Sequence, residues 1–177
     1  MSQFVAAAPR QLSLAGRLLA IYLTLCLLLI AQYLLGMVAN LFVTVPARHP
    51  GAGASNYFGG IVSAFGWVIP NGPAWIAAHA ALGMALAVAA FAAVVVAWPH
   101  ASRAARWLSI FGALTIVGAG FNGMSFLNYG HDASSMIMAG LWALALACYL
   151  AALALLLAGR ITGPRLASAP AGDSAGR

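Results

Sequence analysis

Histidine is the side chain in this sequence with the widest chemical use, because imidazole can carry protons and bind metals. The chain has four histidines and only two acidic residues. His79 stands inside Pro73–Trp98, a run without any charged residue. An imidazole in such an apolar run has to face protein or a cavity, because contact with lipid would be costly. His79 is therefore the first candidate for a binding residue.

The residue types offer little to an enzyme. The sequence shows no paired carboxylates, no recognisable Ser-His-Asp set, no glycine-rich phosphate loop and no CxxC motif. Acid–base and nucleophilic catalysis depend on such groups. We therefore expect a non-catalytic role.

Four apolar runs are each long enough to cross a bilayer as a helix, which takes about 20 residues. The chain is 64% hydrophobic and 6% charged, whereas soluble domains have about 25% charged residues. The predicted fold is all-α, a polytopic membrane four-helix bundle that forms one domain over residues 1–163. We expect residues 164–177 to be a disordered cytoplasmic tail. The predicted spans are residues 18–43, 73–98, 104–127 and 133–158.

The loop of residues 44–72 is the only long connection. Its first half is turn material, rich in proline and glycine. Its second half, residues 56–69, places apolar side chains such as Phe58 and Phe65 at helical spacing. This segment is too short to span a bilayer, so the sequence predicts a short interfacial helix across the outer end of the bundle.

Arginine positions predict the orientation. Seven of the eight arginines flank the spans on one side, and Arg48 alone falls on the other. The positive-inside rule then places both termini in the cytoplasm. Composition without lysine or glutamate suggests a bacterium, and hence a multi-pass protein of the inner membrane. The expected partners are the lipid bilayer and other membrane subunits or a second copy; the scattered arginines argue against nucleic acid.

Polar and small residues recur on one face of each span. Gln32, Gly36 and Asn40 follow one another at intervals of four in the first span, and His79 and Gly83 do the same in the second. Residues at this spacing share a helix face. One interpretation is ordinary packing, in which small residues let membrane helices approach and polar side chains bond across the interface.

The other interpretation is a ligand pocket in the outer half of the bundle. By their distance from the helix ends, Asn40, His79 and Asn122 lie in one layer, and glycines at 83 and 118 leave space beside them. The predicted pocket residues are Asn40, Gly83, Gly118 and Asn122.

Two resemblances carry further expectations. The run GMVANLFVTVPARHPGAGASNYFGG, followed by HAALG and GAGFNGMSFL, resembles a family of small uncharacterised four-helix bacterial membrane proteins. That resemblance implies fold and location but no activity. The chain also resembles one half of haem A synthase and other four-helix b-haem membrane proteins, whose second and fourth helices hold haem near the outer surface through histidines. The matching positions here are His79 and His131.

Three functions follow as alternatives. The first is an accessory or small binding protein with an outward-facing polar pocket. The second is a b-type haem redox protein with His79 and His131 as ligands. The third is a Zn or Cu site at the outer face, because imidazoles with one carboxylate suit these metals. The ligands of that site would be His49, His79, His131 and Asp132.

Overall fold

The computed structural model of the chain describes residues 14–162, with side chains to residue 159. Over this range the fold is all-α, as predicted, and contains no strand. The predicted tail of residues 164–177 lies outside the described residues. The five helices are α1 (Leu14–Phe42), α2 (Tyr57–Asn71), α3 (Ala74–His100), α4 (Arg103–Tyr129) and α5 (Asp132–Thr162).

Four of these helices are long and apolar enough to cross a membrane, namely α1, α3, α4 and the Asp132–Gly159 part of α5. The shortest has 27 residues, and an α-helix rises about 1.5 Å per residue, so each exceeds the ~30 Å of a hydrocarbon core. The chain is therefore a multi-pass membrane protein. The helices begin and end within a few residues of the predicted spans, because the apolar runs and the helices coincide.

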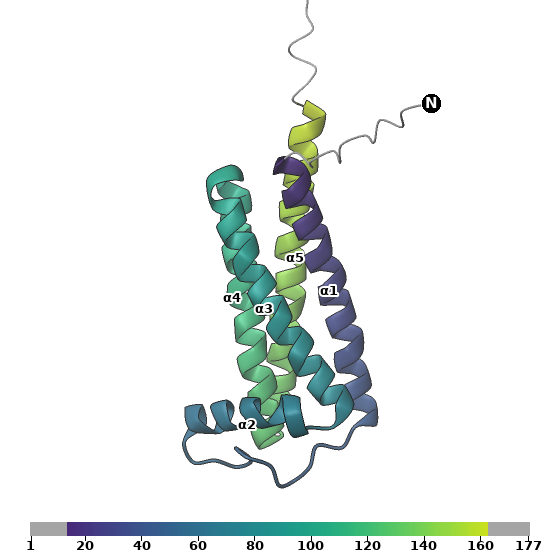
Figure 1. Cartoon of the computed structure of the whole chain (residues 1–177), viewed down its shortest axis with the longest axis vertical. Coiled ribbons are helices and arrows are strands. Elements are labelled where there is room, and N and C mark those ends of the chain that lie inside the picture. The colour runs from purple at the N-terminus through teal and green to yellow at the C-terminus, as the bar shows by residue number, and fades with distance from the viewer. Residues whose placement is uncertain (1–13, 163–177) are drawn as a thin grey trace, which may run out of the picture.

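The long helices form a ring in which α3 packs between α1 and α4, and α5 packs between α4 and α1. Successive helices run in opposite directions, so every neighbouring pair is antiparallel (Figure 1). The first turn of α1 and the last turns of α5 lie at the same end of the bundle.

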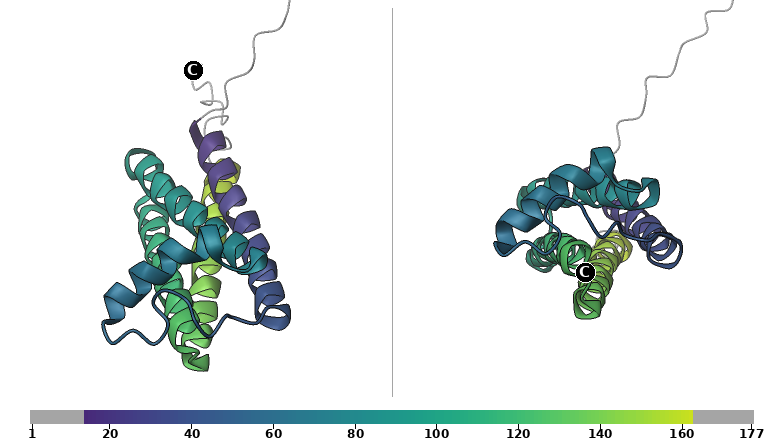
Figure 2. Two further views of the ribbon diagram at one scale, coloured as in Figure 1. Left: turned by 60° about the horizontal axis from the view of Figure 1, so that its bottom comes forward. Right: turned by 90° about the horizontal axis from the view of Figure 1, so that it is seen from below.

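Helix α2 lies across the opposite end of the bundle and packs on α3 and α4 (Figures 1 and 2). Asn56 starts it, because the Asn56 side chain accepts a hydrogen bond of 3.1 Å from the Gly59 amide. Its buried face consists of Gly60, Ile61, Ala64 and Val68. The predicted loop helix is thus present, and its apolar face is covered by the ends of the long helices.

Two buried tyrosines fill the centre of the bundle in the half away from α2. The Tyr22 hydroxyl donates to the Ser109 Oγ at 2.7 Å, since Ser109 itself donates to the Ala105 carbonyl at 2.9 Å. The Tyr149 ring lies 6.1 Å from that of Tyr22, measured between centroids. It packs directly on the backbone of Gly112, where a Cβ would approach the Tyr149 Cζ to 2.8 Å.

Replacing Gly112 tests this packing. Gly112→Ala places a methyl group in the space of the Tyr149 ring, and such overpacking costs about 1–3 kcal/mol of unfolding free energy. The measurement is unfolding in mixed micelles by denaturant titration. Gly120→Ala on the same helix is the control, because nothing lies within 4 Å of its added Cβ. Equal stability of the two variants would contradict the assigned packing.

Candidate functional site

A cavity of about 650 Å³ lies in the half of the bundle that α2 covers. All five helices contribute to its lining: α1 between Leu29 and Asn40, α3 between Ile76 and Ala87, α4 between Ile116 and Leu127, and α2 and α5 with shorter stretches. Its volume falls within the range of roughly 300–1,000 Å³ that is typical of small-molecule sites. The position between helices of a bundle is also a common one for such sites.

The lining is mainly apolar, in contrast to the polar pocket that the sequence predicts. Aliphatic side chains, four methionines and several aromatic rings make up most of it. Tyr33 and Trp142 stack on each other in its wall with ring centroids 4.9 Å apart, and the Trp142 indole donates to the Leu29 carbonyl at 2.7 Å. No residue of this lining is an arginine, lysine, aspartate or glutamate. The cavity therefore suits a largely hydrocarbon molecule.

The main polar feature of the wall is a contact between Gln32 of α1 and His79 of α3. The Gln32 Nε2 donates to the His79 backbone carbonyl at 3.0 Å and lies 3.3 Å from the His79 Nε2. Gln32 is 9% exposed and His79 is partly buried. Both side chains line the cavity. His79 thus faces a partner helix, as its apolar surroundings in the sequence require.

Two glycines make this contact sterically feasible. A Cβ on Gly36 would lie 2.8 Å from the His79 Cε1, and a Cβ on Gly83 would lie 3.1 Å from the Gln32 Nε2. Gln32 and Gly36 are one turn apart on α1, as His79 and Gly83 are on α3. Because α1 and α3 are antiparallel, each polar side chain lies over the glycine of the other helix.

The structure divides the predicted pocket residues into two groups. Asn40 and Gly83 line the cavity, whereas Gly118 and Asn122 are not among its lining residues. The Asn122 Nδ2 donates to the Gly118 carbonyl of its own helix at 2.9 Å. The Asn122 amide is therefore hydrogen-bonded within α4, and it is not the hydrogen-bond partner of His79. The partner of His79 is Gln32, which the spacing with Gly36 marked as part of a polar face but not as a site residue.

His49 lies at the end of α4, where both of its ring nitrogens and its ring face have contacts within the protein. Its ring stacks on Trp67 of α2 with centroids 4.8 Å apart. Its Nε2 lies 3.2 Å from the Leu127 carbonyl and its Nδ1 lies 3.1 Å from the Pro50 carbonyl. A neutral imidazole has one N–H and can donate to only one of these oxygens at a time. His49 thus fastens the loop between α1 and α2 to the end of α4.

The predicted Zn or Cu site is not assembled. His49 lies against α2, His79 against α1, and His131 beside Tyr129 with ring centroids 6.2 Å apart. Asp132 is exposed at the start of α5. Within residues 14–162, no three His, Cys, Asp or Glu side chains lie together closely enough to hold a metal ion. The predicted set of metal ligands was wrong, because the three imidazoles contact different parts of the protein.

The two histidines predicted as haem ligands also stay apart. His79 lines the cavity, whereas His131 is exposed and does not contribute to the lining. His131 immediately precedes α5, and its ring stacks beside that of Tyr129. These residues do not form a pair suited to haem.

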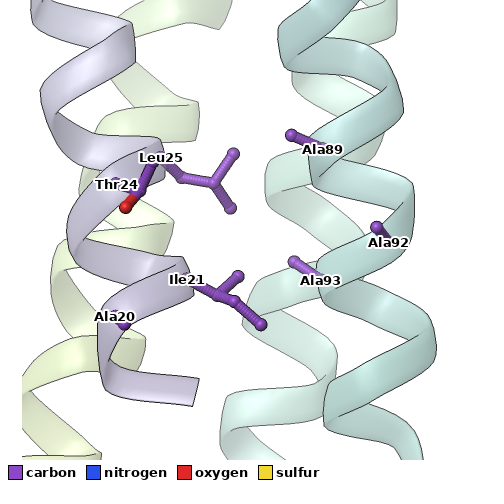
Figure 3. Close-up of a pocket in the computed structure, with 7 residues that line it drawn as sticks. All are labelled: Ala20, Ile21, Thr24, Leu25, Ala89, Ala92 and Ala93. Atoms are coloured by element: carbon purple, nitrogen blue, oxygen red, sulfur yellow. The ribbon is translucent and has the colours of Figure 1, made fainter. Parts of the chain in front are cut away.

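A second hollow, of about 290 Å³, lies between α1 and α3 in the other half of the bundle (Figure 3). Ile21 and Leu25 reach from α1 towards Ala89 and Ala93 of α3. Thr24 supplies the single polar side chain of its lining. It therefore lacks the convergent polar groups that orient a ligand.

Gly36 tests how His79 is held. In Gly36→Ala the new methyl group displaces the imidazole, so the contact with Gln32 is lost. We expect the side-chain ¹⁵N resonances of His79 to shift in the protein labelled at histidine, while those of His100 stay in place. Gly140→Ala on α5, which meets nothing within 4 Å, is the matched control. Unchanged His79 resonances in Gly36→Ala would rule out the assigned contact.

Comparisons with known proteins identify no relative that could assign a function to this site. No family model matches the chain, and neither curated proteins nor solved structures give a match. The two resemblances seen in the sequence therefore stay predictions.

Proposed function

We propose that this protein is a non-catalytic membrane protein that binds a largely apolar small molecule inside its helix bundle. The single observation that carries the proposal is the cavity of about 650 Å³, to which all five helices contribute. Such a volume within a bundle would otherwise forfeit packing contacts, because interiors are normally filled to crystal-like density. A bound molecule restores those contacts.

The lining favours binding over catalysis. Its ionisable side chains are one imidazole, that of His79, and the phenol of Tyr33. No carboxylate or thiol lines the cavity beside them. General acid–base chemistry and covalent catalysis need a second positioned group, as in a nucleophile with its base. The stacked Tyr33 and Trp142 rings offer a flat apolar surface instead.

Access from the bilayer is consistent with this function. Several lining residues reach the surface of the bundle, among them Met37, Met84 and Phe121. All three belong to membrane-spanning helices. A ligand dissolved in lipid can therefore enter sideways without passing through water.

The charge pattern supports an orientation with the cavity towards the outside of a bacterial inner membrane. Arg17, Arg103 and Arg106 lie at the end of the bundle away from α2, near the starts of α1 and α4. Arg48 belongs to the loop at the α2 end. Positive charge accumulates on the cytoplasmic side of membrane proteins.

Reporter fusions test the orientation. A fusion after residue 177 should be active with a cytoplasmic reporter, and an insertion between Ala52 and Ser55 with a periplasmic one. The reverse activity pattern would refute the orientation, though not the cavity.

Blocking the cavity tests the function. Ala87 lines it on α3, so Ala87→Phe fills part of its volume. We expect the purified wild type, extracted in polymer nanodiscs with its native lipids, to carry a small molecule detected by mass spectrometry. Ala87→Phe should retain about tenfold less of it, because the phenyl ring occupies space that the ligand needs. This loss corresponds to ~1.4 kcal/mol of binding free energy.

Ala85→Phe is the control for this substitution, because Ala85 is exposed on the same helix and does not line the cavity. Thermal unfolding of both variants shows whether the fold survives. Gly120→Phe fills the cavity from α4 and serves as the second blocking variant. Equal retention by the wild type and both blocking variants would refute the proposed function.

A further inference from the structure

We propose that the ligand is a neutral lipid whose head group is a hydroxyl, bound by Gln32 and His79. This inference rests on the proposed function and names the ligand class for the same cavity. It follows from the charge of the lining, the hydrogen-bonding state of the two side chains and the residues around them.

The lining excludes a charged head group. Among the cavity-lining residues there is no arginine or lysine to pair with an anion and no carboxylate to pair with a cation. A charge moved into such surroundings without a partner loses its hydration at a large cost in free energy. Fatty acids in their ionised form and phospholipid head groups therefore do not fit inside the cavity.

The contact between Gln32 and His79 fixes which atoms carry hydrogen. The His79 backbone carbonyl can only accept, so the Gln32 nitrogen must be the atom that lies 3.0 Å from it. The other hydrogen of that amide points to the His79 Nε2 at 3.3 Å. The Nε2 is then the acceptor, and in a neutral imidazole the hydrogen is on the Nδ1.

This arrangement leaves one acceptor and one donor without a protein partner. They are the Gln32 Oε1 and the His79 Nδ1, both buried. Unpaired polar atoms at such depth are costly, so a ligand that pairs with both gains affinity. A hydroxyl can accept from the Nδ1–H and donate to the Oε1, whereas a ketone, a quinone or an ether can only accept.

The two atoms are buried, and both residues belong to the cavity lining. The last torsions of glutamine and histidine are soft, so a small rotation turns either group towards a ligand. A glycine lies beside each group, Gly83 at the amide and Gly36 at the imidazole. The absence of Cβ atoms there lets the amide and the imidazole each lie against the backbone of the partner helix.

The rest of the lining suits a hydrocarbon body. Four of the six methionines of the chain line the cavity: Met37, Met84, Met124 and Met138. Methionine is unbranched and polarisable, so it adapts to irregular apolar shapes. A lipid alcohol with an alkyl or alicyclic body therefore matches the wall as well as the polar pair.

Photoaffinity labelling tests the head group. The protein is placed in phosphatidylcholine nanodiscs with one of three long-chain diazirine probes, which end in a hydroxyl, a methyl ether or a carboxylate. We expect the alcohol to label Met84 and Met124 on the order of tenfold more than the ether or the carboxylate does. Labelling of Val95, an exposed residue that does not line the cavity, should be equal for all three.

Substitutions identify the residues that form hydrogen bonds with the hydroxyl of the probe. Gln32→Met and His79→Phe each remove one hydrogen-bonding group and should reduce cavity labelling by the alcohol to the level of the ether. Asn122→Leu is the control, because the Asn122 amide bonds its own helix and does not line the cavity. The comparison of probes on the wild type needs no substitution, so the test holds if a variant fails to fold.

The outcomes separate this inference from the proposed function. Equal cavity labelling by the alcohol and the ether overturns the hydroxyl assignment and leaves the cavity as a binding site. Preferred labelling by the carboxylate overturns the neutral head group. Cavity labelling no greater than that of Val95 for any probe, including in native membranes, overturns the proposed function together with the inference.

Discussion

The structure depends on one constraint: a polar side chain inside a bilayer has to find its hydrogen-bond partner within the protein. Gln32 and His79 meet this constraint together, across the contact between α1 and α3. Their positions require two glycines, because a Cβ on Gly36 or Gly83 would press on the partner side chain. One polar pair and two absent side chains thus set how closely α1 and α3 approach in the half next to α2.

The same constraint explains the loop and α2. The chain between α1 and α2 has irregular backbone, whose polar groups need partners at the end of the bundle. The Gly53 amide donates to the Asn128 carbonyl at 3.0 Å, and the Tyr129 hydroxyl donates to the Ala54 carbonyl at 2.9 Å. The two acceptors are carbonyl groups of the last turn of α4 and of the loop, which would otherwise lack a hydrogen-bond donor. The loop is therefore part of the fold, and it holds α2 over the cavity.

The sequence predicts the spans and the loop helix because their signals are lengths and periodicities of apolar residues, which do not depend on neighbours. It also predicts that His79 faces protein. It does not predict the rotation of each long helix, because these helices are apolar on nearly all sides and membrane lipid accepts any such face. Gly36 and Gly83 carry the rotational information, since backbone approaches closely only where a side chain is missing.

Asn122 shows why a polar stripe is an uncertain guide. An asparagine in a helix can bond to the carbonyl one turn before it, and Asn122 does so at Gly118. Its spacing and depth resemble those of a pocket residue, but its amide needs no partner from another helix. Gln32 has a longer side chain that crosses to α3 instead. Of the predicted pocket residues, Asn40 of α1 and Gly83 of α3 therefore line the cavity, whereas Gly118 and Asn122 of α4 do not.

The two halves of the bundle differ because of where large side chains reach the centre. In the half away from α2, Tyr22 and Tyr149 are fully buried and fill the space among the helices, and alanines at 90, 93 and 97 let α3 pack closely. In the other half, small residues such as Gly83, Ala87 and Ala119 are among those that line the cavity. The loop and α2 fasten the helix ends there, so the helices do not collapse to close the gap. In an isolated pair of helices, such small residues would allow tight packing. In this half of the bundle they leave a cavity instead.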